Sequence, residues 1–246
     1  MIITEVCANS LRSAIIAQQC GAQRIELCQN LMVGGTTPSA ATIQLCRDKL
    51  DIDIFVLLRP RAGDFVYSEL EMEIILKNIA FCKKIGVDGI VIGVLQNDGS
   101  IDTEKTKAFV AAAGDMNITF HRAFDYVPNP LESLEQLIQL KVNRILTSGQ
   151  QHTAIEGKAL IAKLVMQAND KISILAGSGI NIDNVEELIQ TTQVKEIHLS
   201  AKSLLKSTAK YRSSFLLNNS ATIPEHDYFL TDEGKLRRVL ELVRKL

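Results

Sequence analysis

The sequence lacks an excess of charge of either sign. Its 246 residues carry 27 lysines and arginines against 28 aspartates and glutamates, so the formal net charge is -1, and the pI is near 6.4. A chain without a basic field has little attraction for nucleic acid or for an anionic membrane surface. We therefore expect neither nucleic acid nor membrane among its partners.

Long hydrophobic runs are also missing. No apolar stretch approaches the roughly 20 residues of a membrane-spanning helix. The opening residues, MIITEVC, lack the basic and long apolar regions of a secretory signal. From these two absences we expect a cytoplasmic protein.

Cysteine is scarce, and its spacing forms no recognisable framework. The five cysteines are an odd number without C-x-x-C spacing, in a chain too large to need disulfide bonds: Cys7, Cys20, Cys28, Cys46 and Cys82. We expect five reduced thiols. Cys20, Cys46 and Cys82 fall on predicted helices and are best explained by helix packing.

No linker-like or low-complexity segment interrupts the chain before about residue 206, and short β-branched runs alternate with stretches of helical period. Helix starts are marked by Thr37 before Pro38 and by Ser68 with Glu71. The pattern predicts eight strands, at residues 2–6, 24–28, 54–59, 89–94, 118–122, 144–148, 172–177 and 196–201. Eight such units favour a (β/α)8 TIM barrel, with a doubly wound sheet as the alternative.

We expect one domain over residues 1–246, with the barrel core reaching about residue 205 and a C-terminal extension over 206–246. The extension ends in a predicted helix, where four apolar residues fall at helical spacing and should dock on the barrel: Leu236, Val239, Leu240 and Val243. The polar stretch before this helix suits a lid, a subunit contact or a surface loop.

Charged residues follow several of the predicted strands at their carboxyl ends, which meet at the mouth of a barrel of this kind. The candidate catalytic cluster consists of Glu26, Arg59, His121, Asp125 and His198. Either His121 or Glu26 would serve as the general acid or base. Two structural alternatives remain open, because Arg122 and Asp125 can pair at the rim and His198 can be a core histidine bonded to a backbone carbonyl.

The same strand ends offer groups that bind anions. Arginine side chains and glycine-rich turns suit a phosphate or a carboxylate. The candidate anion-binding residues are Arg59, Arg61, Ser148, Gly149, Gly177, Ser178 and Gly179. A small anionic ligand is therefore expected, either as the substrate of an enzyme or as the ligand of a barrel that binds without turnover.

Six segments, in this order, resemble the signature segments of the CutC copper-homeostasis family: IELC, GGTTPS, RPRAGDF, TFHRAFD, LTSG and HLSA. The resemblance implies a cytoplasmic TIM barrel that self-associates and binds Cu(I). It also implies Cys7 and Cys28 as the metal ligands. On this ground, and because of the polar segment before the last helix, we expect a homo-oligomer, most simply a two-fold dimer.

Two functions remain in competition. Thiolates on neighbouring strands, roughly 5 Å apart, can form a soft site for Cu(I), although free cysteines are more often small buried hydrophobes. The charged cluster instead suits an enzyme that acts by acid/base chemistry on a small phosphorylated or carboxylated substrate. The first hypothesis is a copper-homeostasis protein of the CutC type, and the second is a TIM-barrel enzyme.

Overall fold

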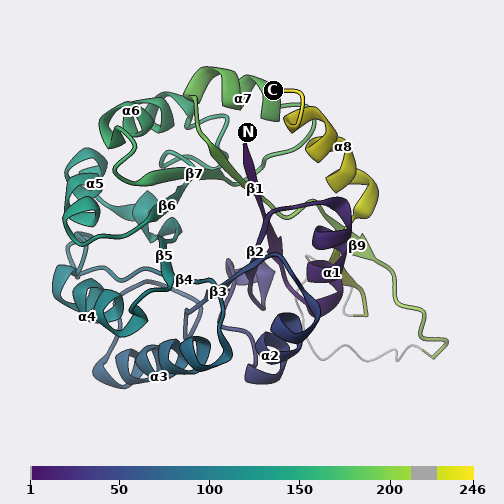
Figure 1. The fold of residues 1–246 in the computed structure, drawn as a ribbon, viewed down its shortest axis with the longest axis horizontal. Helices are drawn as coiled ribbons and strands as arrows, with labels where there is room; N and C mark the ends of the chain where they lie inside the picture. The colour runs from purple at the N-terminus through teal and green to yellow at the C-terminus, as the bar shows by residue number, and fades with distance from the viewer. Residues whose placement is uncertain (1, 212–225) are drawn as a thin grey trace.

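The computed structural model describes residues 2–211 and 226–246. Eight parallel strands close into a barrel, and helices surround it (Figure 1). The strands are β1 (Ile3–Ala8), β2 (Arg24–Leu27), β3 (Asp53–Leu57), β4 (Gly89–Ile92), β5 (Asn117–Phe120), β6 (Arg144–Thr147), β7 (Ser173–Gly177) and β8 (Glu196–Leu199). Each strand pairs in parallel with the next, and β8 pairs with β1. The TIM-barrel prediction is confirmed, because that last pairing excludes an open doubly wound sheet.

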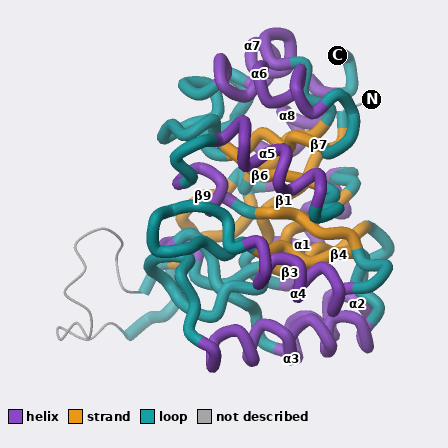
Figure 2. The backbone as a smooth tube through the Cα atoms, turned by 90° about the vertical axis from the view of Figure 1, so that its left-hand side faces the viewer, coloured by secondary structure: helices purple, strands orange, loops and turns teal. Residues whose placement is uncertain are grey.

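Helices follow the strands and form the outer layer of the barrel. Figure 2 shows them flanking the strands when the molecule is turned by 90°. They are α1 (Leu11–Cys20), α2 (Ala40–Lys49), α3 (Glu69–Ile85), α4 (Thr103–Ala113), α5 (Pro130–Gln139), α6 (Lys158–Ala168), α7 (Val185–Thr192) and α8 (Glu233–Val243), with short 3-10 helices η1 (Leu31–Val33) and η2 (Arg122–Tyr126). No helix in these described ranges is both long and apolar enough to span a membrane.

Each strand alternates between a face toward the helices and a face toward the barrel axis. In β1, Val6 and Ala8 pack in the large core that the barrel shares with the helices. Cys7, between them, belongs to a separate apolar cluster with Cys28 and Phe55. Closure of the barrel therefore brings inward-facing side chains from different strands together.

The predicted strands match the observed ones, but several extend one or two residues too far. His121, for example, directly follows β5 and begins η2, because the chain turns there into the mouth loops. The predicted start of α3 is confirmed as a reciprocal capping box between Ser68 and Glu71. Thr37 was wrongly predicted to start α2, which is capped by Ser39, whereas the Thr37 hydroxyl donates to the carbonyl of Arg59 at 3.1 Å.

The C-terminal extension completes the helical layer. α8 packs against both α1 and α7, and it fills the gap between them in Figure 1. Its four predicted docking residues are all buried, as the helical spacing indicated: Leu236, Val239, Leu240 and Val243. Two unpredicted strands precede it, β9 (Lys202–Leu205) and β10 (Tyr228–Thr231), which pair antiparallel. Most of the polar stretch considered as a lid or subunit contact, residues 212–225, lies outside the described residues.

The docking of α8 makes a prediction about stability. Leu236 is fully buried, so Leu236→Ala should lower the free energy of unfolding by about 2–5 kcal/mol. Leu70, which is 74% exposed on α3, supplies the matched control, and Leu70→Ala should change it by less than about 0.5 kcal/mol. Urea unfolding measures both values, and similar values for the two variants would contradict the docking.

Candidate functional site at the barrel mouth

A buried ionic network forms the floor beneath the barrel mouth. Arg24, on β2, donates to Glu5 of β1 and to Glu196 of β8. Arg144, on β6, donates from Nε to the same Glu196 carboxylate at 2.6 Å. Both guanidinium groups lie over the ring of Phe55, at 4.9 and 5.1 Å from its centroid. These contacts join five strands, β1, β2, β3, β6 and β8, across the barrel interior.

The floor keeps its carboxylates ionised despite their burial. Burial alone would raise the pKa of Glu5, but Arg24, His198 and Arg144 outweigh that effect and lower it to about 2. For Glu196, burial again acts upward, while Arg144 and Arg24 lower the pKa. Two carboxylates thus balance two guanidinium groups inside the barrel, which is the condition under which buried charges are tolerated.

His198 lies between this ionic floor and the cavity at the mouth, because its ring contacts Glu5 and also lines the cavity. Its Nδ1 lies 2.7 Å from Oε1 of Glu5, so the carboxylate holds the N–H at Nδ1 and orients the ring. Its Nε2 lies 3.7 Å from Oε2 of Glu26. Burial would lower the pKa of His198, but hydrogen bonds to Cys7 and Glu5 and the charge of Glu26 raise it well above its usual value. Burial raises the pKa of Glu26 itself.

Two thiols lie close together, and one of them, Cys7, lies beside this histidine. The sulfur atoms of Cys7 and Cys28 are 3.6 Å apart, within hydrogen-bond distance and too far apart for a disulfide. One ligand atom from each of Cys7, Glu26 and His198 lies within 4.8 Å of the others. The hydrogen bond with Cys28, followed by burial, raises the pKa of Cys7 well above its usual value. Without a ligand, Cys7 is therefore a protonated thiol.

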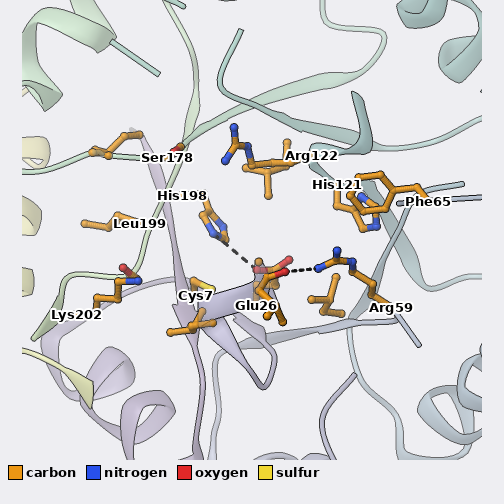
Figure 3. A pocket seen from close by; sticks show the side chains of 18 of the residues that line it. Cys7, Glu26, Arg59, Phe65, His121, Arg122, Ser178, His198, Leu199 and Lys202 are labelled. Carbon is orange, nitrogen blue, oxygen red and sulfur yellow. Dashed lines mark hydrogen bonds and ion pairs between the residues drawn. The ribbon is translucent and has the colours of Figure 1, made fainter. Parts of the chain in front are cut away.

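A cavity of about 480 Å³ opens above these residues at the mouth. In Figure 3, Cys7, Glu26 and His198 lie close together, and His121, Phe65 and Arg59 lie beside them. Among the described residues that line the cavity, the arginine, lysine and acidic side chains are three cations and one carboxyl group: Arg59, Arg122, Lys202 and Glu26. The cavity therefore has a cationic lining that favours an anion.

Arg59 is held at this wall by backbone carbonyls. Its Nη1 donates to the carbonyls of Val33 and Gly35 at 2.7 and 2.8 Å, and its Nη2 donates to Gly63 at 2.8 Å. Its guanidinium also lies 5.0 Å from the ring centroid of Phe65. Arg59 therefore fixes the loops after β2 and β3 while its charge remains at the cavity wall.

The mouth brings together only part of the predicted site. Cys7, Glu26, Arg59, His121 and His198 line the cavity, as do Ser178 and Gly179 of the predicted anion turn. Ser178 adopts a left-handed φ of 86°, and its hydroxyl donates to the carbonyl of His152 at 2.7 Å. The residue types at the strand ends thus pointed to seven residues that line the cavity, and their roles stay predictions.

Other predicted site residues belong to the loops that support the mouth. Asp125 accepts a hydrogen bond from Arg122 at 2.7 Å, so the two residues form the rim pair that was considered as the structural alternative. Asp125 also accepts from the backbone N–H groups of Ser148 and Gln150. Arg61, in the loop after β3, pairs with Asp64 of the same loop and with Glu71 of α3. The remaining predicted anion-binding residues outside the cavity lining are Ser148, Gly149 and Gly177.

Gly149 and Gly177 have packing reasons to be glycine. A Cβ at Gly149 would lie 2.3 Å from the carbonyl oxygen of Gly157, where two backbones approach closely. A Cβ at Gly177 would meet the side chains of Leu146 and His198. The absence of a side chain at Gly149 allows the backbone of Gly157 to approach, and the absence of one at Gly177 leaves space for the side chain of His198.

Sequence reasoning missed several residues that build the site. The floor arginines, Arg24 and Arg144, and Glu196 were not singled out, although each stands two positions before an inward residue of the same strand. That period of two was the available signal. Phe65 and Lys202 also line the cavity. Phe65 ends the RPRAGDF segment but was not singled out, and nothing in the local sequence marks Lys202 as a site residue.

Comparison with known proteins shows the family of this chain. The sequence matches the CutC family over residues 2–203. The chain belongs to the CutC family. A CutC family protein of Glaesserella parasuis is 43% identical over 242 residues, which cover 98% of this chain and 99% of that protein. A human relative, named copper homeostasis protein cutC homolog, is 39% identical over 245 residues, covering 99% of this chain and 90% of the relative.

Solved structures show the same architecture. The crystal structure of CutC from Streptococcus agalactiae superimposes with a TM-score of 0.78 at 36% identity, covering 81% of this chain and 99% of that one. Phosphoribosylanthranilate isomerase from Thermotoga maritima superimposes with a TM-score of 0.60 at 11% identity over the whole of both chains. The second likeness shows the barrel fold alone.

The ionic floor predicts sensitivity to acid. The folded-state pKa of Glu5 lies below its unfolded value, so its ionisation stabilises the fold above about pH 4.5. That contribution, on the order of 3 kcal/mol, is lost as the pH falls through the window from about 4.5 toward 2. Urea unfolding at pH 6, 4 and 3 measures the loss. In Glu5→Gln the free energy of unfolding should fall less between pH 6 and pH 3 than it does in the unaltered protein. An equal fall in both proteins would show that Glu5 is not the source of the acid sensitivity.

Proposed function

We propose that the chain binds Cu(I) at Cys7 and Cys28, with His198 as a third ligand through Nε2. The observation that carries the proposal is the 3.6 Å separation of the Cys7 and Cys28 thiols, together with the position of Cys7 in a group with Glu26 and His198 whose ligand atoms lie within 4.8 Å of one another. Soft thiolate ligands favour Cu(I), and imidazole suits copper as well. The family and the name of the human relative, a copper homeostasis protein homolog, support the same assignment.

The surroundings of the thiols fit such a metal. Glu5 accepts from Nδ1 of His198, which leaves Nε2 as the nitrogen on the side of Cys7 and Glu26. A carboxylate behind a metal-binding histidine commonly fixes the orientation of the ring in this way. The thiols also lie in an apolar cluster with Phe55, Leu57 and Val91, while Cys7 lines the cavity above them.

Replacing the thiols tests this proposal. Cys7→Ser and Cys28→Ser should each abolish stoichiometric Cu(I) binding under reducing conditions, because a hydroxyl is a poor ligand for Cu(I). Competition with a chromogenic Cu(I) chelator measures the stoichiometry, and circular dichroism checks the fold. Cys46→Ser is the matched control, since Cys46 is equally buried but packs in the helical layer. Full Cu(I) stoichiometry in both Cys7→Ser and Cys28→Ser would refute the site.

As a second function, we propose acid/base chemistry on a small phosphorylated or carboxylated substrate in the same cavity. The specific observation is the row formed by Glu5, His198 and Glu26, in which the imidazole lies between two carboxylates at the mouth. The raised pKa of both His198 and Glu26 suits groups that exchange a proton. The three cations of the cavity lining suit an anionic substrate.

Ligand-induced stabilisation tests the second function. Inorganic phosphate or a small carboxylate should raise the free energy of unfolding, by about 2.7 kcal/mol at 100 times its dissociation constant. Lys202→Ala should reduce this stabilisation, because Lys202 lines the cavity. Lys195→Ala is the control, since Lys195 pairs with Asp170 on the surface before β8. No stabilisation by any probe, or equal stabilisation in both variants, would argue against this function.

A further inference from the structure

His121 presents a hydrogen-bond donor that has no acceptor. Its side chain is 5% exposed, and its Nδ1 accepts from the backbone N–H of Ala123 at 3.1 Å. A neutral ring with an acceptor at Nδ1 carries its hydrogen on Nε2. Within the described part of the chain, Nε2 has no hydrogen-bond partner. A buried donor without an acceptor is costly, so this N–H requires an explanation.

The neighbourhood of His121 holds the ring neutral and in place. Burial, and after it the charge of Arg59, lowers the pKa of His121 to about 3. The ring lies directly over Gly93, where a Cβ would come within 2.3 Å of it. Phe65 packs against the imidazole with a tilted ring, at 4.8 Å between ring centroids. The orientation of this imidazole is therefore set by its surroundings.

A second orphaned donor lies on the same wall. Arg59 uses Nη1 and Nη2 to bind backbone carbonyls, whereas its buried Nε has no partner among the described residues. Its guanidinium and the His121 ring both lie against Phe65. The wall thus combines a neutral N–H donor and a fixed cationic N–H donor around one aromatic ring, as Figure 3 shows.

We propose that this wall seats a carboxylate of a small organic acid, with one carboxylate oxygen accepting from Nε2–H of His121. Arg59 supplies the compensating positive charge, and the carbon skeleton of the ligand packs on Phe65 and the apolar lining formed by Leu57 and Leu146. The assignment rests on the small-molecule function proposed above, and it names the group that the ligand carries. His121 is then a donor that orients an oxygen, while proton exchange belongs to His198 and Glu26.

The chemistry favours a carboxylate over a phosphate at this wall. A phosphate presents several charged oxygens and is best bound by many backbone N–H groups, such as those of a glycine turn. The His121 wall instead offers two side-chain donors beside an aromatic ring, which suits a planar group attached to an apolar body. A phosphate on the ligand would lie at the turn that contains Ser178 and Gly179, which also lines the cavity.

The test follows the imidazole nitrogens of isotope-labelled protein by NMR. The chain has only four histidines, so each can be assigned, and His152 and His226, in loops outside the cavity lining, serve as internal references. The probes are acetate, pyruvate and benzoate, with benzamide as the uncharged counterpart of benzoate and inorganic phosphate as the competing anion. At least one carboxylate should shift the Nε2 resonance of His121, and benzamide should shift it less.

Two variants separate a hydrogen bond from a packing role. His121→Leu should weaken binding of the carboxylate roughly tenfold or more, the cost of losing one hydrogen bond to a charged group. His121→Gln keeps an N–H donor near the position of Nε2 and should retain most of the affinity. Cu(I) stoichiometry should stay unchanged in both, because His121 is not among the proposed copper ligands.

The outcomes also distinguish failure of the carboxylate site at His121 from failure of the proposed small-molecule function. If a carboxylate shifts the nitrogen resonances of His198 but not the Nε2 resonance of His121, the carboxylate site at His121 is refuted, while the small-molecule function stands. The same holds if phosphate alone shifts the histidines of the cavity. Should no carboxylate or phosphate shift either histidine, both proposals fail. Because the decisive measurement uses the unaltered protein, it remains valid even if His121→Leu does not fold.

Discussion

The geometry of the barrel mouth depends on the ion pairs that the guanidinium group of Arg24 makes with Glu5 and Glu196. This guanidinium lies inside the barrel between the carboxylates of β1 and β8, where an uncompensated charge would cost several kcal/mol. Glu5 is held in place by this contact, and Glu5 in turn orients His198 through Nδ1. The position of the histidine at the mouth is therefore fixed from below, by ion pairs that take no direct part in binding.

The barrel itself could be predicted because its signal is local. Runs such as IFVLL and ISIL are short, β-branched and apolar, and helix-forming sequence separates them. The floor could not be predicted, because its partners meet only after closure. Arg24 and Glu196 are 172 positions apart, and no local pattern joins them. The pairing of β9 with β10 was missed for the same reason, since their partners are separated by a long stretch of chain.

At the mouth, the sequence identified residue types better than their roles. Glu26, His121 and His198 were chosen because charged groups at strand ends converge in a barrel, and all three line the cavity. Asp125 was chosen for the same reason, yet it binds backbone N–H groups within the supporting loops. The difference lies in loop geometry after the strand, because η2 turns Asp125 away from the cavity while His121 stays on its wall.

The placement of α8 constrains the order in which the molecule can be completed. β1 is paired on one side by β8, and α1 is covered by α8, so the two ends of the ring meet there. During synthesis the edge of β1 stays unpaired until β8 has been made, and the side of α1 that packs on α8 stays uncovered until Glu233–Val243 follows. The mouth takes His198 and Cys7 from the two strands at this seam, so these two side chains come together only when β8 pairs with β1.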